Sequence, residues 1–268
     1  MKITLITPYA GRSRSGNRNT AYRYTRFLRQ LGHKVAIQVD WDGRPADMML
    51  ALHARRSHES ILRFANAYPQ RPLILTLTGT DLYRDIRLDP SARLSMSLAT
   101  RMIVLQETGL KELTPEHQRI TRVIYQSVAP QKPCSKIESY FQICVIGHLR
   151  SEKDPFCCAH ALPLLPAHAG IRVVQLGGAL EPAMKDEALA LMQKDRRYLW
   201  LGELPHWRVM RKLAQSHLMV ISSRMEGGAN VICEAITTGV PVIASDIPGN
   251  IGMLGKDYAG YYPQGNAA

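Results

Sequence analysis

The sequence SSRMEGGANVICEA, residues 222–235, places two glutamates on either side of a glycine turn. It follows an apolar run, Leu218–Ile221, that predicts a buried strand, and it leads into a predicted helix over Asn230–Thr238. Asn230 is a favourable N-cap for that helix. A strand, a glycine turn and a helix in this order are typical of α/β folds, in which ligands bind at the carboxyl ends of parallel strands.

The residue types around the turn favour a sugar nucleotide as the ligand. Glycines let backbone N–H groups approach a ligand closely, and the dipole of the following helix favours an anion. Glu226 at the turn and Glu234 within the helix can accept hydrogen bonds from hydroxyl groups. We therefore expect the N–H groups to face a diphosphate and the carboxylates to hold hydroxyls. An ordinary strand–turn–helix with surface glutamates is the structural alternative.

This stretch resembles part of a known family. With Ala235 and the later GVPVIAS at 239–245, the two glutamates are similar to the nucleotide-sugar site of GT-B glycosyltransferases of the retaining family-four type. The resemblance implies two Rossmann-like domains that face a cleft, with a UDP-sugar as the donor. It extends over nearly the whole chain and is stronger in the second half. We expect Glu234 to bind the ribose hydroxyls of UDP and Glu226 the donor sugar.

A second motif, GHLRSEK at 147–153, follows the predicted first strand of the second domain. The family places a basic pair here against the donor diphosphate, and Lys153 matches its lysine. His148 stands where the family has an arginine, so Arg150 is the better candidate for the second cation, because a guanidinium is always charged. Two cations would neutralise the charge that develops on the departing UDP. A solvated loop with ordinary charges is the alternative. The predicted donor-binding residues are Gly147, His148, Gly227, Gly228, Ala229, Asn230 and Glu234, and the predicted catalytic residues are Lys153, Arg150 and Glu226.

Short apolar runs alternate with longer helical patterns along the chain, which predicts parallel sheets flanked by helices. The segment 127–139 contains Pro130 and Pro133 and shows little periodicity. We therefore expect an acceptor domain at 1–130 and a UDP-sugar-binding domain at 131–268. Tyr258–Asn266 resembles the family's stretch before its last helices, so the C-terminal crossing helices are expected to be missing. The expected strands are Ile3–Thr7, Val35–Val39, Met48–Leu52, Leu73–Leu77, Met102–Leu105, Val123–Tyr125, Gln142–Ile146, Val173–Leu176, Leu199–Leu201, Leu218–Ile221 and Val242–Ala244.

Composition and charge narrow the possible partners. The chain has 268 residues and a formal net charge of +12, which favours an anionic partner. Its arginines are dispersed, and only four Phe and three Trp are available for base stacking, so we expect anionic small molecules rather than nucleic acid. The five cysteines include no spaced pair, which predicts inert thiols in a reducing cytosol and no zinc. No export signal or apolar run of ~20 residues is visible, so we expect a cytoplasmic protein without stable membrane association.

Three strand ends in the first half carry polar groups that point to an acceptor site. A loop over Thr7–Ala21 bears glycines and arginines, and a helix follows it to about Leu31. His53–Arg56 ends the third predicted strand and Thr78–Asp81 ends the fourth, so both should lie at the same edge of the sheet. Many relatives carry a histidine base where Thr78 stands, and its absence fits a nucleophile that is already an anion. His53 is either a packed core histidine or a functional group. The predicted acceptor-binding residues are Gly16, Asn17, Arg18, His53, Arg55, Arg56, Thr78, Gly79 and Asp81.

Several stretches resemble one subgroup, the selenosugar synthases of selenoneine biosynthesis. They are TP at 7–8, GNRNTA at 16–21, WDGRPAD at 41–47, ALHARRS at 51–57, LTGTDLYRD at 77–85 and VIYQS at 123–127. The resemblance implies transfer of a sugar from UDP-N-acetylglucosamine or UDP-glucose to the selenium of selenophosphate. We expect Arg18, Arg55 and Arg56 to bind this anion, because arginine can hold two phosphate oxygens at once. The residues alone lead only to a UDP-sugar transferase with an anionic acceptor.

Three alternatives remain open at this point. Asp40-Trp41-Asp42 is a DxD sequence that can hold a divalent metal in the other major glycosyltransferase fold, but we interpret it as a loop and expect no catalytic metal and no cofactor. A conventional GT-B glycosyltransferase acting on a lipid or polysaccharide, with its basic face on a membrane, would require an exposed apolar helix beside a basic cluster, and no clear one is present in the sequence. A non-catalytic, basic anion-binding protein would explain the charge but not the glutamate motif.

Overall fold

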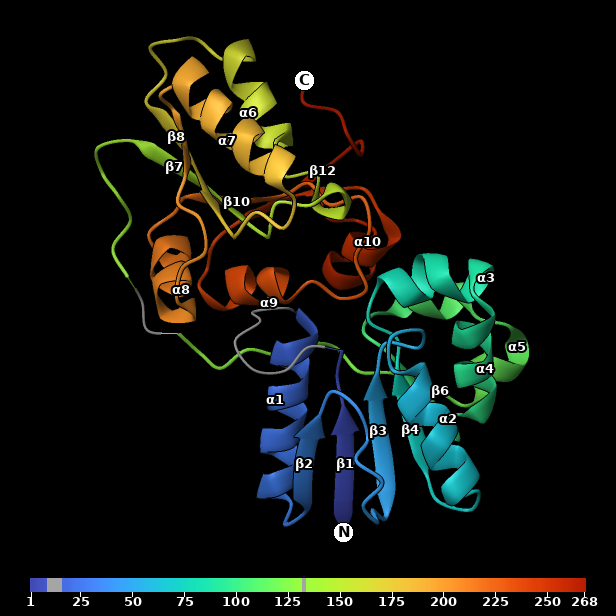
Figure 1. The fold of residues 1–268 in the computed structure, drawn as a ribbon. Helices are drawn as coiled ribbons and strands as arrows, with labels where there is room; N and C mark the ends of the chain where they lie inside the picture. The colour runs from blue at the N-terminus through green and yellow to red at the C-terminus, as the bar shows by residue number, and fades with distance from the viewer. Residues whose placement is uncertain (9–15, 132–133) are drawn as a thin grey trace. The chain divides into compact units, whose positions relative to one another are not determined.

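A computed structural model of the chain describes residues 1–8, 16–131 and 134–268. It divides into two compact units. The first contains Met1–Gln126 together with Glu226–Ala229, and the second contains Ser127–Met225 and Asn230–Ala268. Each unit is a parallel six-stranded sheet with helices packed on it (Figure 1). The predicted fold class, two α/β units with parallel sheets, is confirmed.

The sheet of the first unit has the order β2-β1-β3-β4-β5-β6. The apolar runs form strands because both faces of the sheet are covered. Leu50 and Leu52 pack with α1 on one face, whereas Met49 and Ala51 pack with α2 and α4 on the other. The strands are β1 Lys2–Ile6, β2 Lys34–Gln38, β3 Met48–Leu52, β4 Leu73–Thr76, β5 Arg101–Val104 and β6 Thr121–Val123. The helices are α1 Gly16–Gln30, α2 His58–Ala67, the π-helical η1 Asp81–Asp85, α3 Ile86–Leu88, α4 Pro90–Leu98, the 3₁₀ turn η2 Glu107–Glu112 and α5 Pro115–Arg119.

The second unit repeats this plan with the strand order β12-β11-β10-β7-β8-β9. Helices α6 and α7 cover one face of the sheet, while α8 and α9 cover the other (Figure 1). The strands are β7 Phe141–Ile146, β8 Ile171–Leu176, β9 Tyr198–Trp200, β10 Leu218–Ile221, β11 Val242–Ser245 and β12 Tyr261–Tyr262. The helices are the 3₁₀ turns η3 Ser151–Lys153 and η4 Leu162–Leu164, with α6 Cys157–Ala161, α7 Pro182–Lys194, α8 His206–Ala214, α9 Asn230–Thr237 and α10 Pro248–Leu254.

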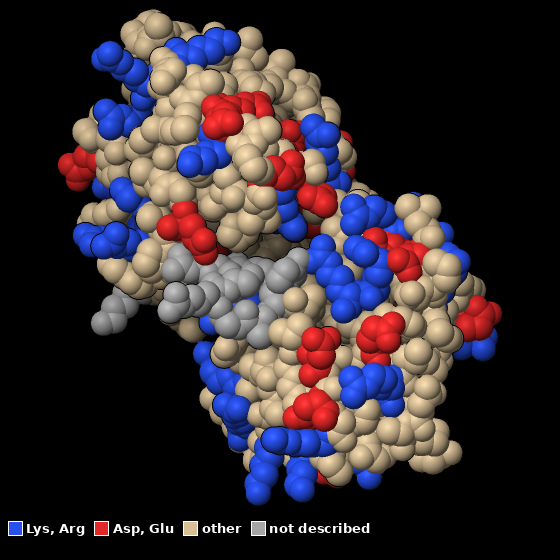
Figure 2. All heavy atoms as spheres, viewed as in Figure 1, with Lys and Arg blue, Asp and Glu red and all other residues tan. Residues whose placement is uncertain are grey.

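Every predicted strand is present, with ends that shift by two residues at most. Strand β12 was not predicted, because two residues are too few to produce a pattern and the strand exists by pairing with β11. In the segment 127–139, the described residues form no helix or strand. No helix in the described part of the chain is long and apolar enough to cross a bilayer. On the face shown in Figure 2, Lys and Arg are scattered over both units with Asp and Glu among them, in keeping with the dispersed basic residues of the sequence.

Candidate donor and acceptor sites

Neighbouring strands bring the predicted donor motifs together at one edge of the second sheet. Strand β7 lies between β10 and β8, and all three are parallel, so the residues after each strand share an edge. Gly147 follows β7, Gly177 follows β8 and Ser222 follows β10. This edge is where α/β sheets bind their ligands.

Lys153 returns to this edge and lies along Gly147. A Cβ added at Gly147 would be 3.6 Å from Cδ of Lys153, so glycine makes room for the lysine stem. Both residues line a small cavity together with Ser222 and Ser223. The structure therefore brings Lys153 and Gly147 together as the sequence analysis expected.

The turn that carries Lys153 is held by the segment after β10. Ser222 Oγ donates to the carbonyl of Asp154 at 2.7 Å, and the N–H of Arg224 donates to the carbonyl of Glu152 at 2.9 Å. Asp154 has φ +44°, a left-handed conformation that needs such support in a non-glycine residue. The lysine loop and the first part of the glutamate motif are thus one connected structure.

Arg150 occupies a different place from Lys153. It does not line the cavity beside Gly147, and its Nε lies 4.0 Å from a carboxylate oxygen of Glu152. Of the expected basic pair, the structure therefore places Lys153 at the cavity but not Arg150. His148 contributes instead to the neighbouring turn.

A glycine pair that the sequence analysis overlooked completes this edge. The N–H of Gly178 donates to Nδ1 of His148 at 3.2 Å. Gly177 has φ +146°, and a Cβ there would be 2.0 Å from the carbonyl oxygen of Gly147. Only glycine allows the ends of β7 and β8 to approach this closely. Two glycines directly after the apolar strand were the signal that could have revealed this turn.

Glu234 lies in α9 and has a partner that spacing could not predict. Its Oε1 lies 3.0 Å from Nε2 of His206, the first residue of α8. Glu234 is 6% exposed, whereas His206 is on the surface. The histidine fixes one carboxylate oxygen and so orients the other. Asn230 begins α9, as predicted, and is half-buried.

The loop between the two glutamates has contacts that group it with the first unit. This loop is Glu226–Ala229, and the residues on either side of it belong to the second unit. Glu226 and Ala229 are buried, at 9% and 3% exposure. Gly227 and Gly228 do not have positive φ angles, so their glycine character serves close approach rather than an unusual backbone.

In the first unit, Asp81 is a structural anchor. Its Oδ1 accepts from the N–H groups of Thr78 and Gly79, both at 2.8 Å, and its Oδ2 accepts from the N–H of Ala54 at 3.0 Å. The side chain is completely buried. Asp81 was predicted to bind the acceptor, but its carboxylate is already used to join the loops after β3 and β4. Thr78 and Gly79 are therefore held in place by it.

His53 is buried and both of its ring nitrogens have partners. Nδ1 accepts from the N–H of Arg56 at 3.3 Å, which leaves Nε2 to carry the proton and donate to the hydroxyl of Thr80 at 3.0 Å. The residue is 2% exposed and has φ +76°. This arrangement is that of a packed core histidine, the first of the two expected readings. It offers no exposed base.

Arg55 is turned toward a carboxylate. Its Nε donates to Asp85 Oδ2 at 2.8 Å, and Asp89 lies 3.9 Å away. Burial alone would raise the pKa of Asp85, but the hydrogen bonds from Arg55 and Arg84 outweigh it and hold this pKa below its ordinary value. The prediction that Arg55 binds the acceptor is weakened, because Asp85 already neutralises it. Arg56 is exposed.

The remaining acceptor candidates begin α1. Gly16, Asn17 and Arg18 form its first turn, and the guanidinium of Arg18 lies over the Tyr22 ring, 4.6 Å from its centre. The loop before them was also predicted to hold an anion, but residues 9–15 lie outside the described residues. Because β1, β3 and β4 are neighbours in the sheet, their three carboxyl ends lie side by side.

The DxD sequence forms a turn. Oδ1 of Asp42 accepts from the N–H of Arg44 at 3.0 Å, and this hydrogen bond lowers the pKa of Asp42. Trp41 between the aspartates is buried and its indole N–H donates to the Arg44 carbonyl. Among residues 1–8, 16–131 and 134–268, no three His, Cys, Asp or Glu side chains gather in a way that could hold a metal ion.

Comparison with known proteins decides the family. Residues 131–267 match the family described as "Glycosyl transferases group 1". The chain belongs to this glycosyltransferase family. It is 22% identical over 278 residues to glycosyltransferase 1 domain-containing protein 1 of Xenopus tropicalis, covering 93% of this chain and 80% of that protein.

Solved structures show the same fold. HepE of Anabaena, in complex with UDP and glucose, matches with a TM-score of 0.72 at 16% identity. The match covers 100% of this chain and 87% of the HepE chain. Sucrose-phosphate synthase of Thermosynechococcus elongatus also has a TM-score of 0.72, at 15% identity, covering 99% and 86%. The group 1 enzyme described here therefore has the GT-B architecture of two Rossmann-like domains, as predicted.

Proposed function

We propose that this glycosyltransferase moves a sugar from UDP-N-acetylglucosamine or UDP-glucose to the selenium of selenophosphate. The proposal for the donor is supported by similar structures solved with UDP and with UDP-glucose. It is also supported by the edge of the second unit, where Lys153 and Gly147 line one small cavity with Ser222 and Ser223. Glu234, oriented by His206, would receive the ribose hydroxyls.

The observation that carries the acceptor proposal is the state of His53. Both ring nitrogens are engaged and the ring is buried, so His53 is not placed to remove a proton from an acceptor. A general base accelerates attack by a hydroxyl nucleophile, whereas selenophosphate carries its negative charge already. The choice of selenium rests on the resemblance of six sequence motifs to those of selenosugar synthases, and Arg18 and Arg56 are the candidate cations.

The transfer step then needs electrostatic help but no proton transfer. The bond between the anomeric carbon and the UDP oxygen breaks, UDP leaves with the electron pair, and selenium supplies the pair for the new carbon–selenium bond. The ammonium of Lys153 would stabilise the charge that grows on the leaving diphosphate. The arrangement requires no metal in this role.

The cell compartment is part of the same proposal. Selenophosphate is a reduced selenium compound, and all five cysteines of the chain are free thiols. We place the reaction in a reducing cytoplasm.

The test is to incubate the protein with each of the two UDP-sugars and with selenophosphate, thiophosphate or phosphate, and to follow UDP release and product mass. We expect UDP and the sugar joined through selenium to phosphate, which water can then cleave at the Se–P bond to a selenosugar and phosphate. Reaction should be slower with thiophosphate and absent with phosphate. Lys153→Ala should lower turnover by about a hundredfold or more, and Lys185→Ala on α7 is the matched control. Turnover with a lipid or polysaccharide acceptor alone would refute the acceptor assignment and leave the donor assignment standing.

A further inference from the structure

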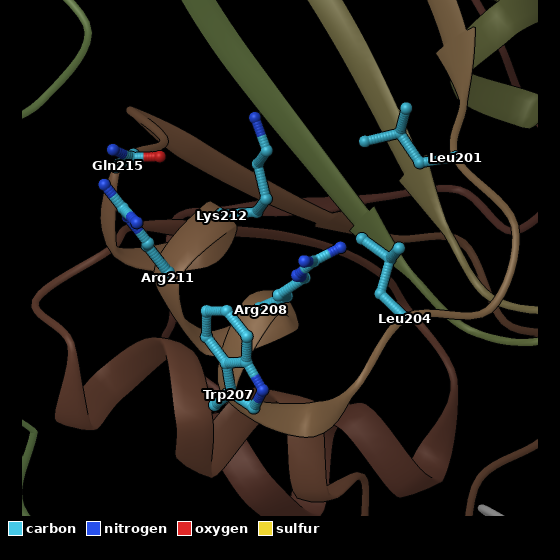
Figure 3. Close-up of a pocket in the computed structure, with 7 residues that line it drawn as sticks. All are labelled: Leu201, Leu204, Trp207, Arg208, Arg211, Lys212 and Gln215. Carbon is cyan, nitrogen blue, oxygen red and sulfur yellow. The ribbon is translucent and has the colours of Figure 1, made fainter.

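A groove along α8 lies outside all the residues assigned above. Helix α8 and the residue after it supply Trp207, Arg208, Arg211, Lys212 and Gln215, and the chain after β9 supplies Leu201 and Leu204. Figure 3 shows the two leucines on one side of this space and the helix side chains on the other. We propose that this α8 groove binds a small organic phosphate, in which a phosphate group is joined to an apolar or aromatic body.

The helical period puts the polar lining residues on one face. Arg208, Arg211, Lys212 and Gln215 follow each other at intervals of three, one and three residues, which places them along one side of α8. The other side is anchored in the core by Met210 and Leu213, which are 6% and 0% exposed. The space is about 650 Å³, within the range of roughly 300–1,000 Å³ that is usual for small-molecule sites.

The positive charges in the groove are not neutralised by the protein. Within the part of the chain that the structure describes, no carboxylate forms an ion pair with Arg208, Arg211 or Lys212. Glu203 is near in sequence, but its carboxylate lies beside Gly178. Neighbouring cations repel each other, and a dianion bound at this face of α8 reduces that repulsion.

The apolar part of the ligand is indicated by the rest of the lining. Leu201 and Leu204 make no favourable polar contact with an inorganic ion, but they can pack against a hydrocarbon or an aromatic ring. Trp207 is 61% exposed and the guanidinium of Arg208 lies 5.2 Å from its ring centre, so the indole can close over a bound ring.

Two macromolecular ligands fit these features less well. A bilayer surface is flat and would meet a protruding helix rather than a hollow between a helix and a strand end. A nucleic-acid strand would use a series of aromatic platforms, and this groove has the single indole of Trp207. The volume and mixed lining favour a single small molecule.

The α8 groove is distinct from the donor site but lies close to it in the chain. Gly147, Lys153 and Glu234 do not line the groove. His206, which contacts Glu234, precedes Trp207 directly. Any binding experiment must therefore separate the two sites, and UDP provides the means.

The probe is 2-naphthyl phosphate, titrated into the full chain by calorimetry. Inorganic phosphate and 2-naphthol serve as its charged and aromatic halves. We expect the ester to bind and each half alone to bind at least about tenfold more weakly. The triple variant Arg208→Gln/Arg211→Gln/Lys212→Gln should weaken ester binding roughly ten- to a hundredfold or more. The triple variant Lys185→Gln/Lys194→Gln/Arg196→Gln, on α7 and just after it, removes the same charge elsewhere in the unit and should bind like the wild type.

Any of the following three outcomes would overturn the proposal. Equal losses in both triple variants would mean that net charge alone attracts the ester. Competitive displacement by UDP would assign the groove to the donor site. Sedimentation with phosphatidylglycerol vesicles, without ester binding, would assign the surface to a bilayer. Wild-type UDP affinity shows that the α8 variant is folded, and the single exposed Arg211→Gln repeats the test with the least disturbance.

Discussion

Buried carboxylates on the acceptor side have partners that residue type could not reveal. Asp81 and Arg55 stand in motifs at strand ends, where ligand-binding residues are common, so both were predicted to bind the acceptor. In the structure Asp81 accepts from three backbone N–H groups and Arg55 donates to Asp85. These hydrogen bonds fix the positions of Thr78, Gly79 and the chain around His53.

The Arg55–Asp85 pair makes a prediction about acid stability. Because the pKa of Asp85 in the folded chain is below its ordinary value of 3.8, the pair stabilises the fold above about pH 4 and loses this effect as pH falls further. Arg55→Gln should therefore lower the thermal unfolding midpoint at pH 7, and the difference from the wild type should shrink below pH 4. Melting curves from pH 7 to pH 3 measure it. Arg101→Gln, at an exposed site, is the control, and a difference that grows in acid would contradict the assignment.

Glu234 gives a second prediction at the residue scale. Loss of a buried, charged hydrogen-bond acceptor costs roughly 1.5–3 kcal/mol, so Glu234→Ala should weaken UDP binding about ten- to a hundredfold. His206→Ala should have a smaller effect, because it removes the residue that orients Glu234 and leaves the carboxylate that binds the ribose. Calorimetry with UDP compares both with Glu187→Ala, an exposed glutamate on α7. Unchanged UDP affinity in Glu234→Ala would remove this residue from the donor site.

At the scale of elements, the sequence predicted strands most accurately where both faces of the sheet are buried. Strands covered on both faces, such as Met48–Leu52 and Leu218–Ile221, read as continuous apolar runs and were located to the residue. Three features could not be found this way. β12 depends on its pairing with β11, the π-helical turn η1 begins and ends at aspartates that bond to the segment after β3, and the contact of His206 with Glu234 joins residues 28 positions apart. Such pairings arise only when the elements pack.

The turn between β8 and α7 tests this packing argument. Gly177→Ala should destabilise the second unit by about 1–3 kcal/mol, because the residue has φ +146° and the new Cβ would meet the Gly147 carbonyl. Gly170→Ala is the matched control, since nothing lies within 4 Å of a Cβ there and its φ is not positive. Urea unfolding of both variants measures the difference. Equal stability of the two would show that the close approach of β7 and β8 is relaxed in solution.

At the scale of the whole molecule, the two units carry different parts of the proposed reaction. The cavity of Lys153 and Gly147 and the carboxylate of Glu234 are built in the second unit, whereas His53, Thr78 and the start of α1 are built in the first. The net charge of +12 is shared across the molecule rather than gathered into a tail, which suits small anionic substrates. The loop Glu226–Ala229 groups with the first unit and packs on Thr78, so a change at Thr78 can reach the donor motif. Changes at acceptor residues away from this loop, such as His53, should leave donor binding intact.

His53 is the residue at which this division and the base-free reaction can be tested together. His53→Asn keeps a side chain that tolerates φ +76° and can still accept from the N–H of Arg56, but it cannot act as a base. We expect UDP affinity to be unchanged, and the pH dependence of the rate with selenophosphate to have the same shape in the variant and the wild type. Any limb that comes from ionisation of selenophosphate itself appears in both. If the variant bound both substrates but lost the reaction, His53 would be the catalytic base, and the acceptor would be a group that must be deprotonated.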